Sequence, residues 1–106
     1  MLPGVIRDQA RRLRKALAGD EGHERRLTQN EINLARKIFG SSIDYTRVKI
    51  HPHGYTFFQP KGSGMTPNGE IYFEGSASSD FGLATAFLQT FFIHEMTHVW
   101  QKQNGV

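Results

Sequence analysis

Apolar residues recur at helical spacing in two segments of the N-terminal half of the chain. In residues 5–18 they alternate with Arg and Lys, which predicts a short amphipathic helix. A second helix is predicted to begin after Thr28, because Thr28 and Glu31 have the spacing of a capping box, and to end at Gly40. Its apolar residues are Ile32, Leu34, Ala35, Ile38 and Phe39.

The longest apolar pattern lies near the C-terminus. Residues 83–102 are predicted to form one helix, with a buried stripe that consists of Leu88, Phe92, Met96 and Val99. Ser79 or Asp80 is the expected N-cap, since short polar side chains favour that position. Gly105 stands where a glycine in the left-handed conformation commonly ends a helix.

Between the helices the pattern changes to short β-rich runs separated by turn residues. Three strands are predicted, at residues 45–50, 55–58 and 70–74, and the segments that contain Gly and Pro between them are predicted to be loops. The order of helix, helix, three strands and helix indicates an α+β fold, in which the helices pack on one face of a small sheet.

Length and composition indicate a single soluble domain. The chain has 106 residues, of which 38% are hydrophobic, and it contains no cysteine. A chain of this length has room for one hydrophobic core, and we divide it into a basic N-terminal helix and linker at residues 1–27 and a core at 28–106. Without cysteine, a disulfide scaffold is excluded, and a metal site would have to use His and carboxylate ligands.

Basic residues are concentrated at the N-terminus. Seven of the thirteen Lys and Arg residues lie within the first 26 positions, whereas the net charge of the whole chain is +3. Such a run could contact nucleic acid, but it contains no aromatic side chain that would stack on bases, and acidic residues interrupt it. We therefore interpret it as a solvated helix with a flanking loop, and nucleic-acid binding is the lesser alternative.

The most informative motif is His94-Glu95-Met96-Thr97-His98, which has the pattern H-E-x-x-H and lies within the predicted C-terminal helix. Residues four apart on a helix share one face, so His94 and His98 are expected to bind one metal ion, Zn²⁺. Glu95 would act as general base toward a metal-bound water, which predicts hydrolysis of peptide bonds. The alternative is a surface helix with two incidental histidines.

A catalytic zinc ion normally has three protein ligands, and this motif supplies two of them. The eight residues after His98 include no good ligand, so the third is expected upstream, in another chain, or nowhere. The upstream candidates are His51, His53, Asp44, Glu70, Glu74 and Asp80. His51 and His53 flank a predicted turn that could direct an imidazole across a cleft, although ordinary hydrogen bonds would also explain them. Asp80 has the alternative role of a helix cap.

Several blocks along the chain resemble one group of bacterial proteins. They are Thr28-x-x-Glu31, Phe39-Gly40, Val48–His51, Ile71–Phe73 and the run from His94 to Gln101. Together they resemble the zinc metallopeptidase domains that occur alone or attached to Rhs and Vgr-related proteins of type VI secretion. The match covers residues 28–104. The resemblance implies a minimal zincin-like fold, metal ligands at His94 and His98, and a catalytic carboxyl group at Glu95. It also draws attention to His51, whose block belongs to the pattern, and leaves the role of His51 open.

The resemblance also implies partners and a location. We expect a peptide or protein substrate, partners in the secretion apparatus, and export from the bacterial cytoplasm by a contact-dependent system. No segment has the apolar length of a membrane span or of a secretory signal, so no membrane contact is expected. Larger members of the group continue past the position of Val106, which leaves an alternative: a non-catalytic interaction module with an incomplete metal site. An oligomer that completes the site between chains is also open.

Overall fold

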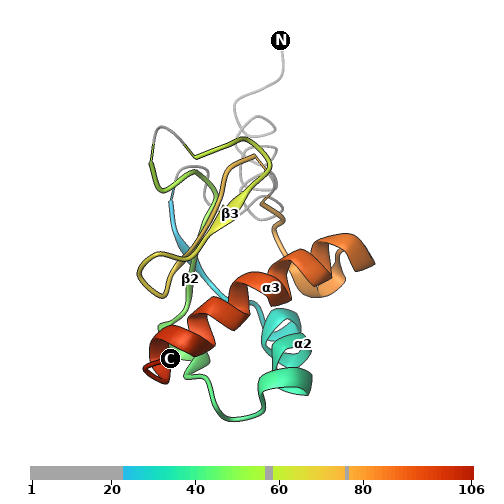
Figure 1. Cartoon of the computed structure of the whole chain (residues 1–106). Coiled ribbons are helices and arrows are strands. Elements are labelled where there is room, and N and C mark those ends of the chain that lie inside the picture. Colours follow the sequence, from blue (N-terminus) through green and yellow to red (C-terminus); the bar gives the residue numbers. More distant parts are fainter. Residues whose placement is uncertain (1–22, 57–58, 76) are drawn as a thin grey trace, which may run out of the picture.

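The computed structural model describes residues 23–56, 59–75 and 77–106. The helix predicted at residues 5–18, and with it most of the basic run, lies outside this part of the chain. The described elements follow the order β1 (Arg25–Arg26), α2 (Gln29–Phe39), the 3₁₀ helix η1 (Tyr45–Arg47), β2 (Lys49–His51), β3 (Gly64–Met65), β4 (Ile71–Phe73), the 3₁₀ helix η2 (Phe81–Leu83) and α3 (Ala86–Gln103). They form a small α+β domain, as predicted, in which α3 runs along one side of the sheet and α2 lies beside α3 (Figure 1).

The sheet has four strands in the order β1-β2-β4-β3, not the three predicted. The central pair, β2 and β4, is parallel, and both outer pairs are antiparallel. β1 and β3 have two residues each and lie in segments that were predicted as loops. Such short strands are too brief to show alternation in the sequence, and they exist because a neighbouring strand supplies their hydrogen bonds.

One predicted strand is absent in its described part, and the other two are shorter than expected, at β2 and β4. In the segment predicted as a strand at 45–50, residues 45–47 form η1, because the Asp44 side chain accepts a hydrogen bond from the Thr46 backbone and caps the turn. The prediction of a strand at 55–58 was wrong for residues 55 and 56, since Tyr55 and Thr56 form a bend. Residues 57–58 lie outside the described part.

The hydrophobic core lies between the sheet and α3 and is dominated by phenylalanine rings. The Phe81 ring stacks on the Phe92 ring, with centroids 5.4 Å apart and an interplanar angle of 12°, and the centroids of Phe73 and Phe81 are 4.8 Å apart. All three side chains are fully buried. Since Phe73 belongs to β4, Phe81 to η2 and Phe92 to α3, this cluster fixes the helix against the sheet.

Both described α-helices begin and end at recognisable caps. The capping box predicted at Thr28 and Glu31 is confirmed, and α2 ends at Gly40. The N-cap of α3 is Thr85, not Asp80 or Ser79, because η2 forms a separate turn before the helix and Asp80 caps that turn. None of the described helices is long and apolar enough to cross a membrane.

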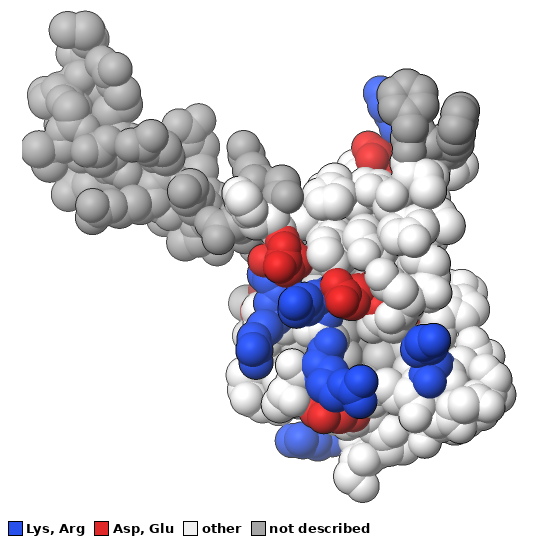
Figure 2. All heavy atoms as spheres, turned by 90° about the vertical axis from the view of Figure 1, so that its left-hand side faces the viewer, with Lys and Arg blue, Asp and Glu red and all other residues white. Residues whose placement is uncertain are grey.

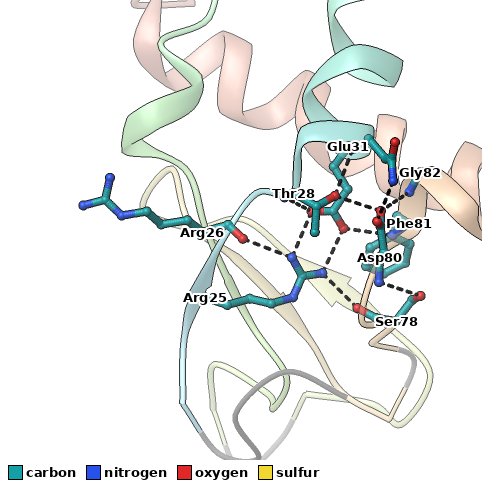
Figure 3. A network of polar contacts seen from close by, with 9 residues as sticks. Arg25, Arg26, Thr28, Glu31, Ser78, Asp80, Phe81 and Gly82 are labelled. Carbon is teal, nitrogen blue, oxygen red and sulfur yellow. Dashed lines mark hydrogen bonds and ion pairs between the residues drawn. The ribbon is translucent and has the colours of Figure 1, made fainter. Parts of the chain in front are cut away.

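A buried carboxylate connects the first strand, α2 and η2 (Figure 3). Glu31 is fully buried, and the guanidinium group of Arg25 donates to both of its oxygens at 2.8 and 2.9 Å. The backbone N–H groups of Thr28 and Phe81 donate to the same carboxylate at 2.8 and 2.9 Å. Four donors therefore compensate the loss of hydration of this side chain.

Replacement of Glu31 by glutamine is expected to destabilise the fold by about 3 kcal/mol, because Arg25 then loses its charge partner in a buried site. The matched control is Glu24→Gln, which makes the same change on an exposed side chain. The free energy of unfolding, measured by denaturant titration, should change by less than about 0.5 kcal/mol in the control. Equal effects of the two substitutions would contradict the structural role of Glu31.

Candidate functional site

The H-E-x-x-H motif occupies the middle of α3. Phe92, Met96 and Val99 of this helix face the core and are fully buried, which confirms most of the predicted stripe. Because a helix advances 100° per residue, this orientation turns His94 and His98 toward the surface. The two imidazole rings lie near each other, with centroids 5.1 Å apart and planes at 82°. The side chain of His94 is 69% exposed.

Glu95 differs from the two histidines because its side chain is only 6% exposed. It points toward the strand β3. The hydroxyl of Thr66, just after β3, donates to Oε1 of Glu95 at 2.9 Å, and Oε2 lies 3.9 Å from Nε2 of His94. The close approach requires a glycine in the strand: a methyl group at Gly64 would lie 3.0 Å from the Glu95 carboxyl carbon and 3.1 Å from the Phe91 ring.

The motif and the segment after β3 enclose a common hollow of about 290 Å³. Its lining residues are Gly64, Met65, Thr66, Pro67, His94, Glu95 and His98. The three chemically important side chains of the motif therefore face the same space. A hollow that combines two imidazoles with a buried carboxylate has the features of a candidate site.

Gln101 holds the imidazole of His98. Its Oε1 lies 2.9 Å from Nδ1 of His98, so Nδ1 is assigned as the protonated nitrogen and Nε2 keeps its lone pair. A hydrogen bond of this kind commonly fixes the tautomer and orientation of a metal-binding histidine. From the sequence, no good metal ligand was expected after His98 and this role of Gln101 was not predicted, although its spacing of three residues from His98 places the two side chains on one face of the helix.

His51 and His53 do not line this hollow. His51 pairs in register with Tyr72, and its ring stacks on the Tyr72 ring at 4.1 Å. Since successive residues of a strand face opposite sides, these rings lie on the side of the sheet away from α3. Nε2 of His51 lies 2.6 Å from Oε1 of Glu70, and Nδ1 of His53 lies 2.9 Å from the carbonyl oxygen of Gly54.

The other upstream candidates are also engaged elsewhere. Asp44 caps η1, and Glu74 accepts a hydrogen bond from the backbone of Gly54. Asp80 accepts hydrogen bonds from the side chains of Thr28 and Asn30 (2.8 and 3.0 Å) and from the backbone of Gly82 (2.9 Å). In the described part of the chain, no three His, Asp or Glu side chains are grouped so that they could hold a metal ion.

In the described part of the chain, charged residues of both signs share the surface. Arg25, which belongs to the N-terminal basic run, forms an ion pair with Glu31. Figure 2 shows one face on which Lys and Arg side chains are interspersed with Asp and Glu. A second hollow, of about 460 Å³, includes Arg47, Lys49 and Lys102, and Glu70 also lines it. This mixed distribution is typical of a solvated surface.

No family model matches the chain. In an alignment of 95 positions the chain is 45% identical to the type VI secretion system spike protein VgrG2b of Pseudomonas aeruginosa, and the match covers 87% of this chain and 9% of VgrG2b. Its structure is similar to that of the effector domain of Pseudomonas aeruginosa VgrG2b, with a TM-score of 0.76 and 40% identity. That match covers 96% of this chain and 59% of the solved domain. The chain is therefore homologous to this effector domain, which confirms the expected relation to Vgr proteins.

The hydrogen bonds at Asp80 predict a loss of stability in acid. Burial alone would raise the pKa of this carboxyl group, but hydrogen bonds from Asn30, Thr28 and Gly82, with the nearby charge of Arg25, outweigh burial and lower the pKa. A lowered pKa stabilises the fold above the ordinary Asp value of about 3.9, and this contribution disappears as the pH falls through the value in the folded state.

The free energies of unfolding of the wild type and of Asp80→Asn, measured between pH 7 and pH 2.5, test this linkage. The wild type is expected to be more stable at pH 7, and the difference should shrink below about pH 4 as Asp80 becomes protonated. A difference that stays constant over the whole range would contradict it.

Proposed function

We propose that this homologue of the VgrG2b effector domain is a zinc-dependent metallopeptidase domain with a zincin-like site. In this proposal His94 and His98 are metal ligands and Glu95 is the general base. The homology gives the context of type VI secretion, and the motif on α3 suggests the chemistry. Partners in the secretion apparatus, contact-dependent export and a peptide or protein substrate belong to the same proposal.

The observation that carries the proposal is the contrast between two buried glutamates. Glu31 has four hydrogen-bond donors, whereas within the described residues Thr66 is the one donor to Glu95. A buried carboxylate with so few partners is unfavourable unless something else compensates it. A cation held by His94 and His98 would do so, since the second oxygen of Glu95 lies on the side of His94.

The donor set fits zinc in part. Neutral imidazole is a common zinc ligand, and the bond of Gln101 to Nδ1 of His98 leaves Nε2 available. The third protein ligand would have to come from outside the described residues or from another chain, because those residues bring no further His, Asp or Glu to the two histidines. When bound, the ion would lower the pKa of a water molecule to about 7 and polarise a carbonyl group.

The remaining chemistry depends on groups of this chain. Glu95 would accept the proton of the attacking water and then deliver it to the nitrogen of the leaving amine. β3 lies at the end of the strand order, and its residues Gly64 and Met65 line the hollow. An extended peptide could add to such an edge by backbone hydrogen bonds, which would place its carbonyl groups near Glu95.

A non-catalytic interaction module is the second candidate. The observation that favours it is the grouping of only two potential ligands in the described part of the chain. In this case the chain would keep the fold of the VgrG2b effector domain and bind a partner without hydrolysis. The metal content and the effect of Glu95 substitution separate the two candidates.

Purified protein is expected to contain about one zinc ion per chain. His94→Ala should lower this content at least about 10-fold by removing a ligand. His53→Ala is the matched control, because it removes an exposed imidazole outside the hollow. Elemental analysis of protein prepared without chelators provides the measurement. Equal zinc in all three proteins would refute the ligand assignment, and a wild type without zinc would favour the interaction module.

Glu95→Gln is expected to lower the rate of peptide hydrolysis at least about 100-fold while zinc binding remains, because the amide cannot accept the proton. Its free energy of unfolding should stay the same or rise, since a neutral group replaces a buried charge with few partners. Cleavage of an unfolded protein substrate and denaturant titration measure the two effects. Undiminished hydrolysis by this variant would exclude Glu95 as the base.

A further inference from the structure

The two oxygens of Glu95 have different surroundings. Oε1 accepts the hydrogen bond of Thr66 at 2.9 Å, whereas Oε2 lies on the side of His94, 3.9 Å from its Nε2. A carboxylate that is free to rotate would exchange these two positions. The hydroxyl of Thr66 opposes this rotation, because it donates a hydrogen bond to one of the two oxygens from the side of the sheet.

Thr66 lies between two fixed segments of backbone, which are β3 before it and the turn toward β4 after it. Met65 pairs in register with Tyr72, so the backbone next to Thr66 is fixed to β4. The following turn is fixed as well, since Asn68 accepts from the Glu70 backbone at 3.1 Å and donates to the Tyr72 hydroxyl at 3.1 Å. The backbone that carries the Thr66 side chain is therefore fixed to the sheet on both sides.

Gly64 completes the arrangement from the same strand. Its lack of a side chain lets β3 lie directly on the carboxyl group of Glu95, where a methyl group would be only 3.0 Å away. The carboxyl group is thus enclosed by Gly64 on one side and fixed by Thr66 at one oxygen. The oxygen that remains, Oε2, lies on the side of His94.

We propose that Thr66 is a positioning residue for Glu95: it binds Oε1 so that Oε2 is the oxygen that exchanges protons in the hollow. This inference rests on the proposed function for its catalytic part. It assigns to the segment after β3 a role in holding the base, in addition to lining the hollow. No atom of Thr66 takes part in bond making or breaking.

Thr66→Val tests the inference, because it removes the hydroxyl and keeps the shape of the side chain. With zinc-loaded protein, kcat for peptide hydrolysis should fall about 10-fold while KM and zinc content stay unchanged, as for the loss of an orienting hydrogen bond. Thr66→Ser, which keeps the hydroxyl, should restore kcat to within about 3-fold. Thr90→Val is the matched control, since the Thr90 hydroxyl donates to Ala86 of its own helix at 2.9 Å, and its kcat should be unchanged.

A second measurement does not depend on activity. In full-length protein labelled with ¹³C at glutamate side chains, Glu95 should be more mobile in Thr66→Val than in the wild type or in Thr66→Ser, as measured by NMR relaxation. If the wild type hydrolyses no peptide, the proposed function fails, and this measurement still decides the role of Thr66. Unchanged mobility of Glu95 in Thr66→Val, or an unchanged kcat in active protein, would overturn the inference.

Discussion

The position of α3 depends on a carboxylate that belongs to another helix. Glu31 is enclosed in the interior and stays there because Arg25, Thr28 and Phe81 direct donors at it (Figure 3). The bond to the Phe81 backbone places the Phe81 ring, which stacks on Phe92 of α3. Because a buried charge without its partners is strongly destabilising, β1, α2 and η2 have to assemble together. The helix that carries the motif is thereby fixed in rotation as well as in position.

This rotation divides the motif between two environments. With Phe92 and Met96 directed at the core, the intervening residues are distributed around the helix in steps of 100°. Glu95 then faces β3, and His94 and His98 face outward on one side. The chemical difference between one buried acid and two accessible imidazoles therefore follows from the apolar stripe. If each residue of the helix took the place of the residue before it, Glu95 would occupy the exposed position of His94.

Local signals allowed the sequence to predict the two described α-helices, and non-local contacts explain what it missed. The capping box of Thr28, the apolar stripe of α3 and the pattern of its motif all lie within a few residues, so they could be recognised directly. β1 and β3 depend on partners far along the chain and have no pattern of their own. The same applies to the bond of Thr66 to Glu95, which joins residues 29 positions apart. His51 lies on the other side of the sheet because side chains alternate along β2, and the sequence does not reveal which side faces α3.

The two buried glutamates show how stability and chemistry are separated in this small domain. Glu31 serves the fold, and four donors bind its two oxygens. Glu95 has one oxygen bound by Thr66 and the other directed at a hollow that contains two imidazoles, so it is buried without being fully satisfied. Proteins keep such a group where its incomplete bonding is used, because replacement by a neutral side chain would otherwise be favoured. Burial in an apolar setting also strengthens the interaction of a carboxylate with a nearby cation. The packing that makes Glu95 unfavourable for the fold therefore agrees with the role proposed for it, because a bound cation would compensate its charge.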